Sequence, residues 1–227
     1  MNSLVDELLR GGLINGKTMV MDATFIKAYS KRDPHENSRG GSDPQARVGR
    51  NGKTCELGYK LHVAVDAKSE LPIAVIAASA NDNEKKHAPA LLEKALKATK
   101  DRVKLVVADS QYSSRNLRDQ ASLHGVRAVI PFPTNQQRAQ KGLLRVDKYF
   151  RTHGPTDEKQ VYRLRSSIER VNSRLKEQLS LERHRVRGLG RINMHALLCI
   201  IAMLLTALAA LRLNRVDKAR SITLLAR

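Results

Sequence analysis

Two acidic residues lie in stretches where a strand would normally carry apolar side chains. Asp22 lies within MVMDAT, and Asp109 ends the apolar run KLVVAD. A carboxylate in an apolar strand costs free energy unless it is paired, hydrogen-bonded or bound to a cation. For Asp109 a structural role is an equal alternative, because an aspartate at the end of a strand can cap the next turn. Asp22 is the stronger candidate for chemistry, because its strand continues through Phe25 and Ile26.

A third carboxylate, Glu169, lies in the basic stretch YRLRSSIERVNSRLKE, residues 162–177. If this stretch is one helix, with about 100° per residue, four of its residues fall within a sector roughly 60° wide: Tyr162, Arg165, Glu169 and Lys176. Apolar residues repeat at helical spacing in the neighbouring sector. We therefore expect the helix to pack through its apolar seam and to present the four residues along one edge. A solvated face with ordinary salt bridges is the alternative.

The three carboxylates together indicate a metal site for phosphoryl transfer. Three carboxylates within about 4 Å of one another repel by a few kcal/mol per pair at an effective dielectric constant near 20. Divalent cations reverse the sign of that energy, and magnesium prefers hard oxygen ligands. Two such ions can activate the attacking oxygen and stabilise the leaving oxygen of a phosphodiester. Asp22, Asp109 and Glu169 are therefore the candidate metal ligands and catalytic residues.

The composition indicates a polyanionic partner. The formal net charge is +19, and the self-repulsion of so much charge destabilises a folded chain. Nucleic acid is the usual partner of such a protein, although a DNA-packing protein without chemistry would be equally basic. The two cysteines are not spaced as a pair and the sequence opens without a secretory leader, so we expect a cytoplasmic protein.

The elements that must position these acids follow from the hydrophobic patterns. The order predicts an α/β fold with a five-stranded mixed sheet and helices on both faces. We expect strands at 17–30, in a hairpin over 57–79, at 103–110 and at 126–132, and helices at 3–10, 81–99, 113–124, 160–180 and 196–211. We expect Asp66, at the hairpin turn, and Asp82, at a helix start, to be structural. His62 and His87 receive no assignment.

The apolar run 196–211 invites a membrane assignment. It is 16 residues long by the sequence, and arginines flank it at 191 and 212. Because about 18 apolar residues are usually needed to span a bilayer, we expect a helix buried in a soluble core and no membrane partner, with a membrane span as the alternative.

Two basic segments are candidate DNA contacts. Residues 32–54 are rich in turn residues and predict a flexible loop rather than a packed element, with Arg47, Arg50 and Lys53 as DNA contacts. A solvated, disordered flap is the alternative. The connector after residue 180 offers Arg183, Arg185 and Arg187. Residues 134–159 are weakly patterned and predict an irregular connector.

The basic stretch around Glu169 and two further segments resemble a known family. Tyr162, Arg165, Glu169 and Lys176 match the Y-x2-R-x3-E-x6-K signature of bacterial insertion-sequence DDE transposases. DPQARVGRNGKTCELGYKLHVAVD and RVRGLGRINMHALLCIIAMLL resemble two further segments of that family. The resemblance covers roughly residues 17–213, with a short helical segment at 1–16 before it and a basic tail at 214–227 after it.

The resemblance implies an RNase H-like catalytic domain with Asp22, Asp109 and Glu169 as the DDE triad. It implies two Mg²⁺ ions, with Mn²⁺ able to substitute, and a metal-dependent cleavage and strand transfer of insertion-sequence ends. The implied partners are double-stranded DNA, as transposon ends and target, and a second copy of the chain as a homodimer on DNA. The implied location is the bacterial cytoplasm, in association with the nucleoid. Arg165 and Lys176 would hold phosphates, and Tyr162 would stack on the substrate, hydrogen-bond it or serve packing.

Two departures from the family pattern keep alternatives open. Asp109 is followed by Ser110-Gln111, where many relatives have a lysine and a glycine. Only 21 residues precede Asp22, whereas the family usually carries a DNA-binding region upstream. The alternatives are a truncated, catalytically inactive DNA-binding remnant or regulator, and an RNase H-like nuclease without strand transfer.

Overall fold

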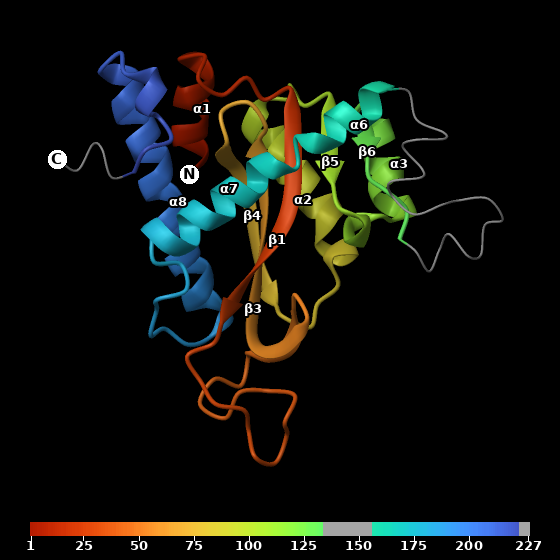
Figure 1. Ribbon diagram of the computed structural model, residues 1–227, viewed down its shortest axis with the longest axis vertical. Coiled ribbons are helices and arrows are strands. Elements are labelled where there is room, and N and C mark those ends of the chain that lie inside the picture. Colours follow the sequence, from red (N-terminus) through yellow and green to blue (C-terminus); the bar gives the residue numbers. More distant parts are fainter. Residues whose placement is uncertain (134–155, 223–227) are drawn as a thin grey trace.

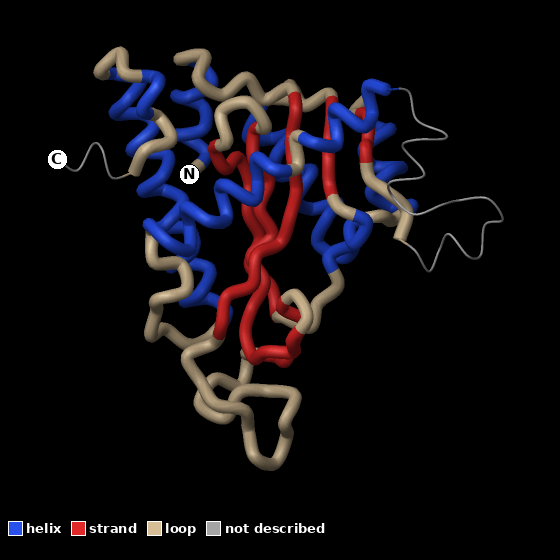
Figure 2. The backbone as a smooth tube through the Cα atoms, in the orientation of Figure 1, coloured by secondary structure: helices blue, strands red, loops and turns tan. Residues whose placement is uncertain are grey.

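The computed structural model describes residues 1–133 and 156–222 of the chain. A mixed β-sheet lies at the centre of this part, and helices surround it (Figures 1 and 2). The six strands are β1 (Thr18–Lys27), β2 (Arg47–Asn51), β3 (Thr54–Asp66), β4 (Leu71–Ser79), β5 (Leu105–Ala108) and β6 (Arg127–Val129).

The order of the strands places the first and fifth side by side. β1 pairs in an antiparallel sense with β3 on one side and in parallel with β5 on the other. β4 lies antiparallel to β3, and β6 lies parallel to β5. Parallel neighbours need a crossover, which the helices between the strands supply. The prediction of an α/β fold with a mixed sheet is confirmed.

Helices lie on both faces of the sheet, as predicted. In Figure 1, α7 crosses in front of β1, while α2 lies behind the sheet. The helices are α1 (Asn2–Arg10), α2 (Glu84–Thr99), α3 (Arg115–Leu123), α6 (Thr156–Arg163), α7 (Ser166–Ser173) and α8 (Leu189–Arg212). Short helical turns also form at Ser110–Tyr112 and Val216–Lys218, and Arg174–Gln178 is a π-helix.

The predicted loop at 32–54 contains a strand, and the prediction is wrong there. Residues 47–51 form β2, which pairs with the first residues of β3. Packing is close, because a Cβ built on Gly49 would lie 2.1 Å from the carbonyl oxygen of Ala80. Asp43 is also buried, and its Oδ1 accepts a hydrogen bond of 2.8 Å from the Tyr59 hydroxyl. The sheet therefore has six strands rather than five.

The predicted helix over 160–180 is interrupted. α6 ends at Arg163, α7 begins at Ser166, and residues 174–178 continue as a π-helix. The edge inferred from one straight helix is therefore not continuous. Of the connector predicted for 134–159, residues 134–155 lie outside the described part, and the remaining four begin α6.

α8 is the apolar helix, and it is longer than the apolar run within it. Residues such as Ile200 and Leu204 pack into the core, and the helix contacts β4 and α1. By length and composition it is one helix of the described chain that could cross a membrane, with 44% of its most apolar window buried. The prediction of a core helix holds for this buried face, whereas Met194, Leu198 and Leu205 are exposed.

Both ends of the described chain pack against the same core. On α1, Val5 and Leu8 are fully buried. Beyond α8, residues expected to form a tail turn back over the molecule, and Ala219 is buried. The guanidinium of Arg220 then reaches the turn between β3 and β4.

Candidate active site

Asp22 and Asp109 lie on neighbouring strands at the point where one strand ends. β1 and β5 are paired up to Met21 and Ala108, so the two aspartates follow directly in register. Adjacent strands are about 4.8 Å apart. β5 stops at Ala108, while β1 continues to Lys27. Among residues 1–133 and 156–222, no strand pairs with that edge of β1 beyond Asp22.

The backbone holds both carboxylates by one oxygen. Asp22 Oδ1 accepts a hydrogen bond of 2.9 Å from the amide of Ala23. Asp109 Oδ1 accepts one of 2.9 Å from the amide of Gln111 and so caps the helical turn that follows. The capping role considered for Asp109 is therefore real, and it leaves the second oxygen available for chemistry.

The pKa of each carboxylate is raised above its ordinary value. Burial, and next the charge of Asp109, raises the pKa of Asp22 to about 6. Burial also raises the pKa of Asp109, although the amide of Gln111 and the charge of Arg165 counteract it. A cation bound between two such groups would relieve this cost. The pair therefore has the donor chemistry of a site for a hard divalent metal.

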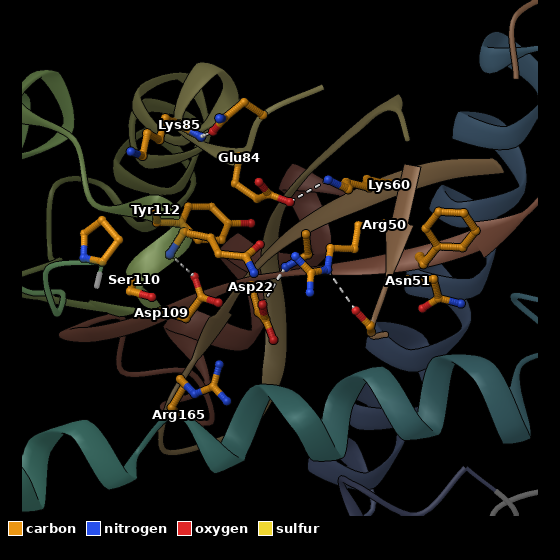
Figure 3. A pocket seen from close by; sticks show the side chains of 16 residues that line it. Asp22, Arg50, Asn51, Lys60, Glu84, Lys85, Asp109, Ser110, Tyr112 and Arg165 are labelled. Carbon is orange, nitrogen blue, oxygen red and sulfur yellow. Dashed lines mark hydrogen bonds and ion pairs between the residues drawn. The ribbon is translucent and has the colours of Figure 1, made fainter. Parts of the chain in front are cut away.

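The aspartates open into a cavity of about 730 Å³. Figure 3 shows Asp22 and Asp109 at its centre, with Arg165 approaching from one side and Glu84 and Lys60 on the other. Lys60 Nζ lies 2.6 Å from Glu84 Oε1, and both side chains are largely buried. Further basic residues line the wall, Arg50 from β2 and Lys85 from α2. The cavity combines an acidic centre with a basic rim.

Glu169 lies beside the aspartates without joining them. Its Oε1 accepts a hydrogen bond of 2.8 Å from Arg165, and its side chain is 55% exposed. Its charge contributes to the raised pKa of Asp22, so it lies within electrostatic range. Across residues 1–133 and 156–222, however, no three His, Cys, Asp or Glu side chains are gathered closely enough to hold a metal. The structure brings two of the three predicted ligands, Asp22 and Asp109, together, whereas the third, Glu169, is paired with Arg165.

The other residues of the signature divide between the cavity and the far end of the helix. Arg165 lines the cavity, and its charge partly offsets the rise in the pKa of both aspartates. Tyr162 is partly buried, and burial raises its pKa. Lys176 Nζ is paired at 2.6 Å with Glu182. Lys176 lies in the π-helix, where the chain departs from the α-helical spacing that the prediction assumed.

The two predicted basic segments lie against each other. In the connector, Arg187 donates a hydrogen bond of 3.0 Å to the carbonyl of Tyr29. The amide of Gly188 donates one of 3.1 Å to Asp43. Arg183 and Arg185 are exposed on the same connector. Arg50, by contrast, lines the cavity, while Arg47 donates to the carbonyl of Pro44 and Lys53 is exposed.

Sequence reasoning missed the buried polar residues around the cavity. Tyr112 lines the cavity and its hydroxyl pairs at 3.0 Å with Nδ1 of His62. The His62 ring lies 4.8 Å from that of His87. Burial lowers the pKa of His62 to about 3, so the ring is neutral. The pairing of these residues depends on register and helix position, and the sequence carries no signal for either.

Two aspartates assigned to structure do have structural contacts. Asp66 is fully buried, and its carboxylate accepts hydrogen bonds from the amides of Gly16 and Ser69. Asp82 contacts Nε2 of His87 at 2.9 Å. Asp66 therefore holds the hairpin turn, and His87 does have a partner.

The sequence profile of the family described as "Transposase DDE domain" matches residues 15–205. The match spans β1 with Asp22, β5 with the adjoining Asp109, and α7 with Glu169. The chain belongs to this family. It is therefore a DNA transposase domain, a metal-dependent polynucleotidyl transferase of DNA transposition.

Several solved structures resemble this transposase domain distantly. The catalytic core domain of BIV integrase is 12% identical, with a TM-score of 0.45 and 83% of each chain covered. The Mos1 transposase paired-end complex with left transposon end is 13% identical, with a TM-score of 0.32, and covers 76% of this chain and 56% of that one. The Mos1 mariner paired end complex with Mn is 14% identical, with a TM-score of 0.32 and 76% and 60% covered. The assignment of the family rests on the profile match.

Proposed function

We propose that this transposase domain cleaves and joins insertion-sequence ends with Asp22, Asp109 and Glu169 as its metal-binding acids. One observation carries the proposal: the register of β1 and β5 sets Asp22 and Asp109 side by side at the opening of a cavity. Both have a raised pKa, so both are poised to gain from a bound cation. Two Mg²⁺ ions, with Mn²⁺ able to substitute, fit this oxygen donor set.

The role proposed for Glu169 requires it to exchange partners. In the structure its carboxylate is neutralised by Arg165. Arg165 also lies near both aspartates and lines the cavity. A DNA phosphate entering the cavity would give Arg165 a second anion to bind and would free Glu169 to turn toward Asp22. An arginine suits this exchange, because its planar fork binds carboxylate and phosphate equally well.

Bound metal would activate the attacking oxygen and stabilise the leaving oxygen at the cleaved phosphodiester. The chain itself would bind and orient the DNA. Arg50 and Arg165 lie at the cavity and would hold phosphates next to the cleaved bond. Arg47, Lys53 and the connector arginines Arg183, Arg185 and Arg187 would follow the duplex away from it. Lys176 would join them if it leaves Glu182, and Tyr162 would stack on or hydrogen-bond the substrate.

The proposed partners are double-stranded transposon ends and target DNA, bound by a homodimer. The strongly basic composition supports the first part. A DNA-bound protein with this composition would act in the bacterial cytoplasm at the nucleoid, without a membrane partner, and we propose that location. The apolar helix α8 supports it through the face that it buries in the core.

Cleavage of labelled DNA in Mg²⁺ or Mn²⁺ tests the proposed roles. Substituting Asp22→Ala, Asp109→Ala or Glu169→Gln should lower the cleavage rate by about a hundredfold or more, because each change removes a metal ligand. DNA affinity should persist in all three. Glu93→Gln, an exposed change on α2, is the matched control and should cleave normally.

The same assay separates the alternatives. Cleavage with strand joining into a target plasmid supports the transposase. Cleavage without joining would indicate a nuclease, and DNA binding without cleavage in either metal would indicate an inactive remnant. Unimpaired cleavage by Glu169→Gln would show that the third acid has been assigned wrongly.

A further inference from the structure

Besides Asp66, a second buried carboxylate, Glu70, lies at the turn between β3 and β4. Glu70 has a left-handed backbone conformation, with φ of 57°, and its side chain is only 5% exposed. No motif of the sequence points to it. It lines a surface hollow of about 640 Å³ that it shares with Glu169 and with residues of α7 and the segment after α8.

Three arginines from two other parts of the chain surround this carboxylate. Arg170 Nη2 lies 2.6 Å from Glu70 Oε1, and Arg174 Nη2 lies 2.9 Å from Oε2. Arg220 Nη1 lies 3.3 Å from Oε1. Arg170 belongs to α7 and Arg174 begins the π-helix, whereas Arg220 follows α8. One anion thus connects three segments that are distant in the sequence.

We call Glu70 and its three arginine partners the Glu70 clamp. It is not a site for a DNA phosphate, because the guanidinium nitrogens already have acceptors within the protein. Arg170 also donates to Ser166 Oγ at 3.1 Å, and Arg174 also donates to the carbonyls of Arg170, Arg220 and Glu70. Arg220 donates in addition to the carbonyls of Ser69 and Lys68. A DNA phosphate would have to displace these bonds. These charged side chains therefore join segments of the protein to one another rather than bind DNA.

The clamp fixes the orientation of α7 on the sheet, which apolar packing alone does not do. α7 rests on the sheet through Ile168 and Val171, which are fully buried. Apolar burial is non-directional and tolerates small rotations or slides of a helix. Charge-assisted hydrogen bonds fix distance and orientation. Glu169 immediately precedes Arg170, so the clamp sets where its carboxylate can reach.

We propose that Glu70 is a positioning residue for Glu169, acting through Arg170 and Arg174 to fix α7 against the β3–β4 turn. The inference rests on the proposed function, in which Glu169 is a metal ligand. It assigns a part in metal binding to a residue that contacts neither metal nor DNA. Supporting residues behind metal ligands are commonly needed for metal affinity.

Mn²⁺ binding measured by the loss of the free-ion EPR signal tests this inference without relying on activity. Glu70→Gln and Arg174→Gln should weaken Mn²⁺ binding by about tenfold or more, as changes behind metal ligands usually do. Arg220→Gln is the matched control, because it removes a partner of the same carboxylate that does not lie on α7. It should lower the thermal unfolding temperature and leave Mn²⁺ affinity within about twofold.

A further variant, Arg170→Gln, keeps the test decisive if Glu70→Gln does not fold. The Arg170 side chain is 56% exposed, so Arg170→Gln should fold even if Glu70→Gln does not, and it should weaken Mn²⁺ binding by about threefold or more. Unchanged Mn²⁺ affinity in the folded Glu70, Arg174 and Arg170 variants would overturn the inference. Full cleavage activity and parental Mn²⁺ affinity in Glu169→Gln would instead overturn the proposed function. The two failures are therefore distinguishable.

Discussion

At the scale of single residues, the molecule keeps a carboxylate where an apolar side chain would be more stable. Asp22 has a pKa of about 6 in the folded protein, against 3.8 as its ordinary value, chiefly because it is buried and next because Asp109 is near. Below a pH of about 4, Asp22 is protonated in both the folded and the unfolded state, so it does not lower the free energy of unfolding. As the pH rises to about 6, the unfolded chain loses its proton first, so folding stability falls. Above that pH Asp22 is ionised in both states, and the full loss of folding stability remains.

Asp22→Asn should therefore stabilise the metal-free protein at pH 7.5. The difference between the two pKa values corresponds to roughly 2–3 kcal/mol in the free energy of unfolding. Denaturant unfolding in EDTA at pH 7.5 and at pH 4 measures this difference, and the gain should vanish at the lower pH. Asp119→Asn, at a side chain that is 65% exposed, should change stability at neither pH. A less stable Asp22→Asn at pH 7.5 would contradict the account of this site.

Addition of divalent metal should reverse the ranking of the two proteins. Bound metal relieves the repulsion between Asp22 and Asp109 and stabilises only the folded state. Thermal unfolding with millimolar Mn²⁺ should therefore raise the unfolding temperature of the parent and leave that of Asp22→Asn nearly unchanged. An equal rise in both proteins would place the metal elsewhere.

At the scale of elements, the sequence predicts those whose pattern is local. The strands around Asp22 and Asp109 have apolar runs interrupted or ended by an acid, and both form as expected. β2 could not be found, because RVGRN is polar and becomes a strand only by pairing with the first residues of β3, beyond the part of β3 that pairs with β1. The break between α6 and α7 was missed because the apolar spacing continues through it. The Glu70 clamp joins residues at least 100 positions apart, so no local pattern indicates it.

A glycine substitution tests the importance of β2 as an element. Gly49→Ala places a Cβ against the carbonyl of Ala80 and should destabilise the protein by about 1–3 kcal/mol. It should also weaken DNA binding by displacing Arg50 from the cavity wall. Gly190→Ala, in α8 with open space around the added Cβ, should leave both properties unchanged. Denaturant unfolding and DNA titration measure the two effects, and normal DNA affinity in a folded Gly49→Ala would show that β2 does not position Arg50.

At the scale of the whole molecule, two basic segments that are distant in the sequence lie together beside the first residues of α8. The loop after β1 and the connector before α8 come together through Asp43, which holds both Tyr59 and Gly188. Neither segment shows in the sequence that it adjoins the other. The opposite end of α8 lies about 36 Å away for a helix of this length. The protein thus has a candidate surface for the duplex that is distant from the basic residues at the far end of α8, Arg212 and Arg215.

Charge removal at the two ends of α8 tests which surface the duplex follows. Arg183→Gln with Arg185→Gln should reduce the slope of log affinity against log salt by about 2. Arg212→Gln with Arg215→Gln, at the far end, should leave the slope as in the parent. DNA titrations over a range of salt concentrations measure both, and equal reductions would show that binding does not depend on this surface.

The convergence of Asp22, Asp109 and Glu169 on bound metal is tested most directly by anomalous diffraction from crystals of the DNA complex grown with Mn²⁺. The account predicts anomalous peaks bonded to the carboxylates of Asp22 and Asp109, with Glu169 released from Arg165 and bonded to the same metal centre. Peaks at the aspartates with Glu169 still paired to Arg165, or peaks at other residues, would contradict it.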